Sequence, residues 1–189
     1  MEINNNFEVP LPPKDAWKTL MDIPRIAPCM PGAELTGVVD KDTYNGKVSV
    51  RLGPVALTFA GQVKFTDIDE TRFKARVKAQ GKDSKGRGGA NANVDFHLEP
   101  SPLGTRVLVK TDLTLSGAVA QYGRASGMIQ DVAQQLIGQF ANNLKAQLGV
   151  SQPGAGDPPP KPQPRPISGF ALIFSVLANA LRRLFGGKP

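Results

Sequence analysis

The sequence has little of what most hydrolases and metalloproteins depend on. Its 189 residues include one cysteine, Cys29, and one histidine, His97. A lone cysteine cannot form an internal disulfide, and with one histidine it cannot complete a zinc site of the usual ligand types. His97 lies in a strand-like run, on the face opposite to Phe96 and Leu98, so we expect an exposed strand residue. No Ser, His and Asp group has the spacing of a triad. We therefore expect no catalytic residue and no metal site.

Aromatic residues are also scarce, at 6% of the chain, although the net charge is +7. Nucleic-acid-binding domains gather basic residues on one folded face and interleave them with aromatics. Here residues 1–150 hold 18 Lys and Arg against 15 Asp and Glu, and residues 151–189 hold 5 against 1. More than half of the excess charge thus lies in the tail, and we expect no nucleic-acid partner.

The sequence also lacks a complete phosphate-binding loop and a signal peptide. The segment 85–89 (KGRGG) is rich in glycine, but it lacks the Gly-Lys-Ser/Thr ending of a phosphate-binding loop and precedes a strand-like run. A hairpin turn is the interpretation we favour. Residues 1–7 lack the basic and apolar regions of a signal peptide. We expect the protein to face the cytoplasm.

Apolar residues alternate with polar ones up to about residue 116, which is the period of half-buried strands. Short connections join these runs, so they predict an antiparallel sheet with one wet face. The alternating runs comprise Ile3, Phe7 and Val9, then Tyr44 to Leu52, Val55 to Phe65, Phe73 to Ala79, Ala90 to Leu98, and Val107 to Leu115.

Helical patterns interrupt and then end this series. Pro13 can begin a short helix with an apolar stripe, and a second short helix can cover 24–27. From Ile129 to Leu148 apolar residues recur every three or four positions, which predicts one long amphipathic helix. The pattern predicts an α+β domain over residues 1–150, with a curved antiparallel sheet around a long C-terminal helix. Such a sheet can enclose a ligand pocket, and a fully packed core fits the pattern equally well.

The next segment, residues 151–167, is a predicted linker. Seven of the 17 prolines fall between Gln152 and Pro166, with no large apolar residue among them. Polyproline chain extends about 3.1 Å per residue, so this stretch can reach roughly 45 Å. The alternative is a ligand for a proline-reading domain, but no PxxP signal stands out beyond chance in so proline-rich a run.

Residues 168–189 predict an amphipathic helix with Ser168 as a plausible N-cap. Residues 170–185 give about 24 Å of helix, shorter than the roughly 30 Å hydrocarbon core of a bilayer. We expect the helix to lie in the membrane interface, with arginines on its polar side near anionic lipid; docking on a protein surface is the alternative. The predicted membrane-binding residues are Phe170, Ile173, Phe174, Leu177, Leu181, Arg182, Arg183, Leu184 and Phe185.

Three stretches resemble a known family. They are PRIAPCMPGAE at 24–34, GRGGANANVDF at 86–96 and LSGAVAQYGRASGMIQDVAQQLIGQFANNL at 115–144. They are similar to CoxG, a component of carbon monoxide dehydrogenase systems, over about residues 1–150. The resemblance implies a START-like (SRPBCC, Bet v 1-like) helix-grip fold. It also implies an accessory role, without a catalytic residue, for a molybdenum carbon monoxide dehydrogenase or a related molybdenum hydroxylase.

From this resemblance and the tail we expect a peripheral protein on the cytoplasmic face of the cell membrane that binds an isoprenoid quinone, menaquinone or ubiquinone. The quinone would pass electrons from the dehydrogenase to the respiratory chain, and no cofactor would be bound covalently. A membrane anchor or assembly factor without a ligand, or a general lipid-binding module, are the alternatives. The predicted ligand-binding residues are Trp17, Leu20, Met21, Ile26, Met30, Leu57, Phe59, Val63, Met128, Val132, Leu136 and Phe140.

Overall fold

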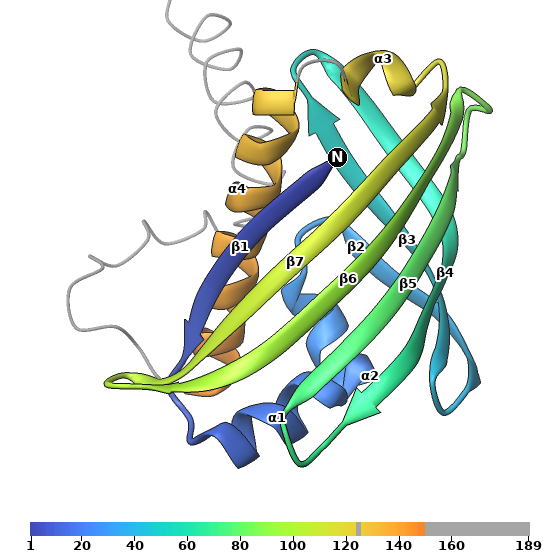
Figure 1. The fold of residues 1–189 in the computed structure, drawn as a ribbon. Helices are drawn as coiled ribbons and strands as arrows, with labels where there is room; N and C mark the ends of the chain where they lie inside the picture. The colour runs from blue at the N-terminus through green and yellow to red at the C-terminus, as the bar shows by residue number, and fades with distance from the viewer. Residues whose placement is uncertain (124–125, 150–189) are drawn as a thin grey trace, which may run out of the picture. The chain divides into compact units, whose positions relative to one another are not determined.

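Seven antiparallel strands form one curved sheet in the spatial order β1-β7-β6-β5-β4-β3-β2 (Figure 1). The computed structural model describes residues 1–123 and 126–149; the predicted linker and amphipathic tail helix lie outside them. The strands are β1 (Glu2–Val9), β2 (Ala33–Asp40), β3 (Thr43–Leu52), β4 (Val55–Asp69), β5 (Lys74–Asp83), β6 (Gly88–Ser101) and β7 (Gly104–Gly117). The alternation of apolar and polar residues correctly predicted an antiparallel sheet and each of its strands except β2.

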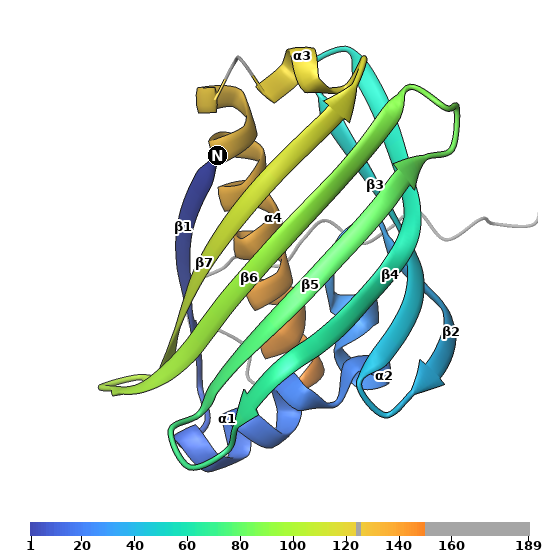
Figure 2. The same cartoon turned by 45° about the vertical axis from the view of Figure 1, so that its right-hand side comes forward.

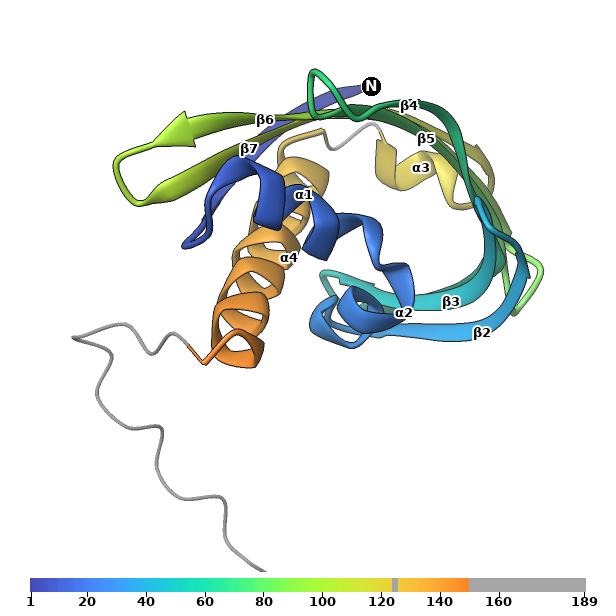
Figure 3. The ribbon, with the colours of Figure 1, turned by 90° about the horizontal axis from the view of Figure 1, so that it is seen from below.

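The long helix α4 (Ser126–Gln147) lies on the concave side of the sheet, close to β1 (Figures 2 and 3). Its C-terminal half is anchored by Leu144, which is 1% exposed, and by Phe140. The ring of Phe140 meets that of Phe7 on β1 edge to face, with centroids 5.5 Å apart. Aromatic edges carry partial positive charge and faces partial negative charge, so this geometry is favourable. The apolar stripe predicted for α4 thus packs against the sheet at this end.

Two short helices and one 3₁₀ turn connect β1 to β2. They are α1 (Pro13–Met21), α2 (Ile23–Ile26) and η1 (Ala27–Cys29). Proline fits the first turn of α1 because the first helical N–H groups have no partner within the helix. The carboxylate of Asp22 accepts a hydrogen bond of 3.3 Å from the N–H of Arg25 and caps α2. In Figure 3 these helices lie beside α4, at the end of the sheet that faces the viewer.

The thiol of Cys29 is buried and donates a hydrogen bond of 3.0 Å to Oε1 of Gln147 on α4. The side-chain amide of Gln147 in turn donates to the carbonyl of Arg25, at 3.2 Å. Burial raises the pKa of the Cys29 thiol, since the charged thiolate is poorly solvated there. Cys29 is therefore a protonated structural residue that joins η1 to α4.

The hairpin between β5 and β6 confirms the interpretation of the glycine-rich segment as a turn. The Asp83 carboxylate is buried and accepts from the backbone N–H groups of Lys85 and Arg87. It also accepts from Nε and Nη2 of Arg87, both at 2.8 Å. These hydrogen bonds hold the pKa of Asp83 far below its ordinary value. His97 also lies where expected, half-exposed on the outer face of β6. Its Nε2 is 3.1 Å from Oε1 of Glu99.

The structure differs from the predicted elements at two places. Strand β2 was not anticipated, because only Leu35 marks its inner face, and bulges interrupt its pairing with β3. Phe73, expected to begin β5, lies in the preceding turn with a positive φ of 51°. The Asp69 carboxylate organises this turn by accepting from the backbone of Thr71 and Arg72, at 3.1 and 3.0 Å. Local turn chemistry thus overrides the alternating pattern there.

Candidate ligand-binding cavity

Three glycines lie side by side across the concave face of the sheet. Gly46 on β3 is directly opposite Gly61 on β4, and Gly61 is directly opposite Gly81 on β5. Ala90 on β6 continues the row opposite Gly81. Strand alternation points the position of each missing side chain to the concave side. The row therefore leaves the middle of the sheet bare of side chains.

In the next row on the same face, the side chains become small toward β6. It runs from Tyr44 through Val63 to Ala79 and Ala92, each directly opposite the next. Glycine in the interior of a strand costs stability and often marks a close approach by a ligand or by another backbone. The two rows together form the floor of an apolar cavity of about 370 Å³.

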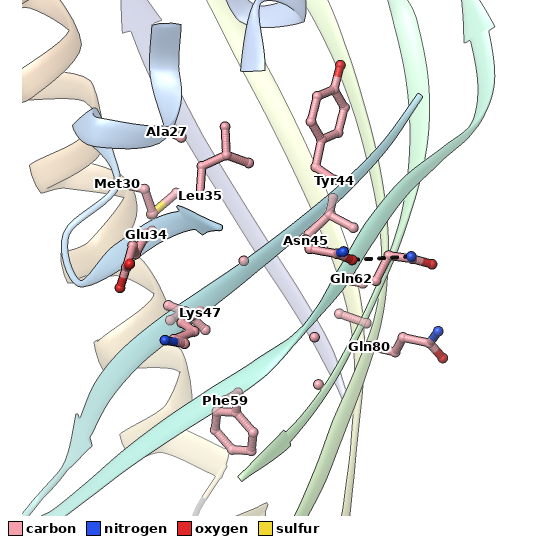
Figure 4. A pocket seen from close by; sticks show the side chains of 18 of the residues that line it. Ala27, Met30, Glu34, Leu35, Tyr44, Asn45, Lys47, Phe59, Gln62 and Gln80 are labelled. Atoms are coloured by element: carbon pink, nitrogen blue, oxygen red, sulfur yellow. Dashed lines mark hydrogen bonds between the residues drawn. The ribbon is translucent and has the colours of Figure 1, made fainter. Parts of the chain in front are cut away.

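The cavity lies between this floor and the segment α2 to η1, and Phe59 borders it (Figure 4). Its remaining border is formed by β2 and the start of β3. Apart from Tyr44, the polar strand residues that border the cavity have side chains directed to the outer face. Asn45 and Gln62, for example, hydrogen-bond to each other at 3.3 Å on that exposed face. The lining residues are Ile23, Ala27, Met30, Ala33, Glu34, Leu35, Tyr44, Asn45, Gly46, Lys47, Val48, Phe59, Gly61, Gln62, Val63, Ala79, Gln80, Gly81, Ala90 and Ala92.

Tyr44 is the lining residue whose polar group shares the inner face. Its hydroxyl already donates a hydrogen bond of 2.8 Å to the carbonyl of Lys41. Burial, and then the charge of Asp42, raise the pKa of Tyr44, so the hydroxyl stays protonated at neutral pH. The side chains that face the cavity therefore select a ligand by shape and apolarity rather than by charge. Val63 is 36% exposed, which leaves this surface open to an incoming molecule.

Two glycines, Gly61 and Gly32, allow neighbouring backbone segments to lie unusually close to each other. A Cβ at Gly61 would overlap the carbonyl oxygen of Gln80, so β4 and β5 can lie this close only with glycine there. Gly32, in the CMPGAE motif, has a φ of +73° and a Cβ would overlap the carbonyl oxygen of Ser49. Its own carbonyl accepts a hydrogen bond of 2.8 Å from the N–H of Ser49. The motif thus fastens the start of β2 beside the cavity.

The predicted ligand-binding residues separate into several groups in the structure. Met30, Phe59 and Val63 line the cavity. Trp17, Leu20 and Phe140 are buried in the main apolar core, where Trp17 meets the rings of Phe73 and Phe96 at 5.9 and 6.0 Å. Ile26 and Met21 pack against that core, and Met21 also borders a separate hollow beside α1. Leu57 belongs to a second core cluster.

The residues predicted from α4 do not border the cavity. Val132 packs against the second core cluster, Met128 is 42% exposed, and Leu136 is half-buried. Sequence reasoning missed the glycine and alanine rows altogether. The signal was present, since Gly46, Gly61 and Gly81 share the parity of the apolar residues in their strands. Whether the α4 residues touch a ligand stays a prediction.

Among residues 1–123 and 126–149, no group of His, Cys, Asp and Glu is arranged to hold a metal ion. Within the same described part of the chain, no helix is long and apolar enough to cross a membrane.

A seven-stranded antiparallel sheet wrapped on a long C-terminal helix, with an apolar cavity between the sheet and the connecting helices, defines the Bet v 1-like helix-grip class. Three solved structures share this fold. A conserved protein from Geobacillus kaustophilus has a TM-score of 0.66 and 22% identity, over 79% of this chain and 95% of that chain. Zhui aromatase/cyclase from Streptomyces sp. R1128 has a TM-score of 0.56 and 14% identity, over 83% of this chain and 99% of that chain. Ara h 8.0201 has a TM-score of 0.51 and 17% identity, over 79% of this chain and 98% of that chain. At these identities the likeness shows the fold alone.

The sequence itself identifies the family. Residues 6–149, which are most of the chain, match the family model for CoxG of carbon monoxide dehydrogenase. The protein therefore belongs to the CoxG family, and the resemblance carried by the CMPGAE and GRGGANANVDF segments is confirmed. A search among curated proteins found no significant match.

Proposed function

We propose that this protein binds an isoprenoid quinone, menaquinone or a close relative, in the apolar cavity. In this proposal it recruits a molybdenum carbon monoxide dehydrogenase to the membrane, and the bound quinone passes the electrons of that enzyme to the respiratory quinone pool. The protein itself is an accessory component and catalyses no reaction. Residues 168–189 hold it on the cytoplasmic face of the membrane.

The observation that carries the proposal is the row of Gly46, Gly61 and Gly81 under an apolar cavity. Gly61 is needed for the close approach of β4 and β5, but a sheet that only needed a packed core would gain from larger side chains at Ala90 and Ala92, because each buried methylene contributes about 0.8 kcal/mol. The same gain becomes available to a ligand when the side chains are missing. An isoprenoid chain, which consists of methyl and methylene groups and is insoluble in water, suits such a space.

The family supplies the second support. A dehydrogenase that oxidises carbon monoxide must deliver electrons to an acceptor, and a respiratory quinone is confined to the bilayer by its chain. A protein that shields the apolar part of the quinone in a cavity and is tethered to the membrane overcomes this separation. The membership of this chain in the CoxG family makes a carbon monoxide dehydrogenase, or a related molybdenum hydroxylase, the proposed partner.

The size of the cavity limits how much of the ligand it holds. Its volume of about 370 Å³ is near the low end of the roughly 300–1,000 Å³ of ligand pockets. It has room for a ring and the first part of a chain, or for a length of chain alone. A long polyisoprenoid would extend beyond the cavity, past the exposed side of Val63.

General lipid binding is the second candidate. Its support is that Tyr44, whose hydroxyl could recognise a quinone carbonyl, is already hydrogen-bonded to Lys41. A cavity that orients its ligand by few polar groups accepts acyl chains as well as isoprenoid chains. In both cases the cavity residues Met30, Phe59 and Val63, together with the glycine row, form the ligand site.

Mass spectrometry of an organic extract from the purified full-length protein separates these candidates. A quinone at a near-equal molar amount is the result that we expect. Fatty acids or phospholipids alone would favour general lipid binding, and an extract without lipid would leave only the membrane anchor.

The extract should be compared between two matched variants. Ala92→Phe fills the cavity from its floor, so the bound lipid should be lost. Ala60→Phe places the same ring on the exposed outer face of β4, opposite Lys47, and should retain the lipid. Equal lipid content in both variants would contradict binding in this cavity.

A further inference from the structure

Four lysines and three amide residues form a patch on the convex face of β3, β4 and β5. Strand pairing places Lys47 and Lys82 on either side of Ala60, and Lys64 directly opposite Lys78. Between these two rows runs a row of amides, with Asn45 opposite Gln62 and Gln62 opposite Gln80. All four lysines are exposed. We name this set the lysine patch: Lys47, Lys64, Lys78, Lys82, Asn45, Gln62 and Gln80.

The lysines of the patch make no ion pair with any residue of the described chain. Two acidic groups, Glu34 opposite Lys47 and Asp40 near Lys64, lie at its β2 side. Toward β6, β7 and β1 the basic residues of the convex face are paired. There Arg76 pairs with Asp95 at 2.7 Å and Lys110 with Glu2 at 2.8 Å. The unneutralised charge on this face is thus concentrated over β3 to β5.

The pairing of Lys64 with Lys78 also works against folding. Like charges directly opposite each other on neighbouring strands repel. Both side chains are on the wet face, where a polar residue of either sign or of none would serve solubility equally well. Two lysines in register therefore carry a repulsion that an acidic partner would relieve.

The composition of the patch favours a protein over a membrane as its partner. Binding in a lipid interface buries exposed apolar side chains. The large exposed apolar residues of the described chain are Met1, Val38, Val39, Val63, Ile68, Leu103 and Met128, and none belongs to the patch. Fixed amide groups between cations offer instead the hydrogen bonds and charge complementarity of a polar protein interface.

The patch lies on the reverse side of the cavity floor. Gln62 follows Gly61 along β4, and Gln80 precedes Gly81 along β5, so the same stretch of backbone borders the cavity on one face and the patch on the other. A partner docked on the patch would leave the exposed side of Val63 free for exchange of the ligand.

We propose that the lysine patch is the docking surface for an acidic face of the partner dehydrogenase, an inference that rests on the proposed function. Four exposed cations that form no ion pair within the described chain steer an acidic partner, so binding should be fast and should weaken as ionic strength rises. The site of partner binding and the site of ligand binding are then separate, and each can be lost without the other.

The test measures binding of the full-length protein to the purified dehydrogenase. Lys64→Glu/Lys78→Glu retains the like-charge contact between the strands and cancels the net positive charge of the four lysines. Lys14→Glu/Lys18→Glu makes the same change of net charge on two exposed lysines of α1. We expect the patch variant to bind at least about tenfold more weakly than the parent, with the control within about twofold, and both to retain the lipid found in the parent extract.

Three results would overturn the docking proposal. Equal weakening in both variants would show that only net charge matters. Loss of binding to vesicles of phosphatidylglycerol and phosphatidylcholine, with unchanged binding to the dehydrogenase, would assign the patch to the membrane. A parent protein that carries quinone but does not bind the dehydrogenase would refute the docking surface together with the recruitment step. By contrast, a patch-dependent complex without any lipid in the extract would support the docking surface and refute quinone binding.

Discussion

The side-chain amide of Asn143 on α4 donates a hydrogen bond of 2.9 Å to the carbonyl of Cys29 in η1. The two residues are 114 positions apart in the sequence, and the bond fixes the α2 to η1 segment that covers the cavity. Gln147, one turn further along α4, holds the same segment through Cys29 and Arg25.

Asn143→Ala should therefore have a free energy of unfolding about 1 kcal/mol below that of a control Asn→Ala change in the same helix, since one hydrogen bond usually contributes that much. Asn142→Ala is the matched control, because Asn142 is equally exposed, has no such hydrogen bond to η1, and undergoes the same change in helix propensity. Urea unfolding of both variants measures the difference. Hydrogen exchange should also become faster at residues 23–30 in the first variant alone; unchanged exchange there would contradict the role assigned to Asn143.

The Asp83–Arg87 pair makes the stability of the fold depend on pH in the acidic range. The pKa of Asp83 is lower in the folded protein than in the unfolded chain, where it is about 4. The pair therefore stabilises the fold at neutral pH, and this contribution is lost progressively as the pH falls below about 5 toward the folded pKa. Asp83→Asn should be less stable than the parent at pH 7, and the difference should shrink toward pH 2. Thermal unfolding between pH 7 and 2 checks this, with Asp131→Asn, an exposed carboxylate of α4, expected to follow the parent throughout.

The lysine patch also predicts a gain in stability. Lys78→Glu would turn the repulsion with Lys64 into an attraction across the strands, worth about 0.2–1 kcal/mol. Lys82→Glu is the control, because its neighbours across the strands are Ala60 and Gly89. Denaturant unfolding at low salt should show stabilisation by the first change alone. Equal effects from the two would mean that Lys64 and Lys78 do not interact.

The tail prediction concerns residues outside the described chain. Removing 152–189 should leave a folded domain, since a proline-rich spacer shares no core with it, and should abolish pelleting with anionic liposomes. Phe174→Asp or Leu177→Asp should act almost as strongly as truncation, and Asn179→Asp only weakly. A truncated protein that still pelleted would place the membrane site on residues 1–151.

The sequence predicted the fold well because burial imposes a period. Core residues such as Phe7, Val107 and Leu144 belong to series of apolar residues that recur with the period of their strand or helix. The side chains that fill the core therefore also reveal the secondary structure in the sequence. The edge strand β2 escaped prediction for the same reason. It has little core to fill, and Val38 and Val39 are exposed on it.

The candidate site was harder to predict because a cavity is the absence of side chains. Reasoning from large apolar residues selected Trp17, Leu20 and Phe140, which are well packed in the core. The residues that create the space are Gly61, Gly81 and Ala92, which look like weak points of a strand. Only the register of four strands, which no single run of sequence contains, shows that they are neighbours.

The central claim is that the glycine-floored cavity holds an apolar ligand, and one measurement tests it most directly. A naphthoquinone with a single isoprene unit, soluble enough to titrate, should be added to the isotope-labelled protein while the amide resonances are followed by nuclear magnetic resonance. We predict saturable shifts concentrated at Gly46, Gly61, Gly81 and Ala92, lost in Ala92→Phe and retained in Ala60→Phe. Shifts confined to α1 or the outer face, or no saturable shift, would contradict the account.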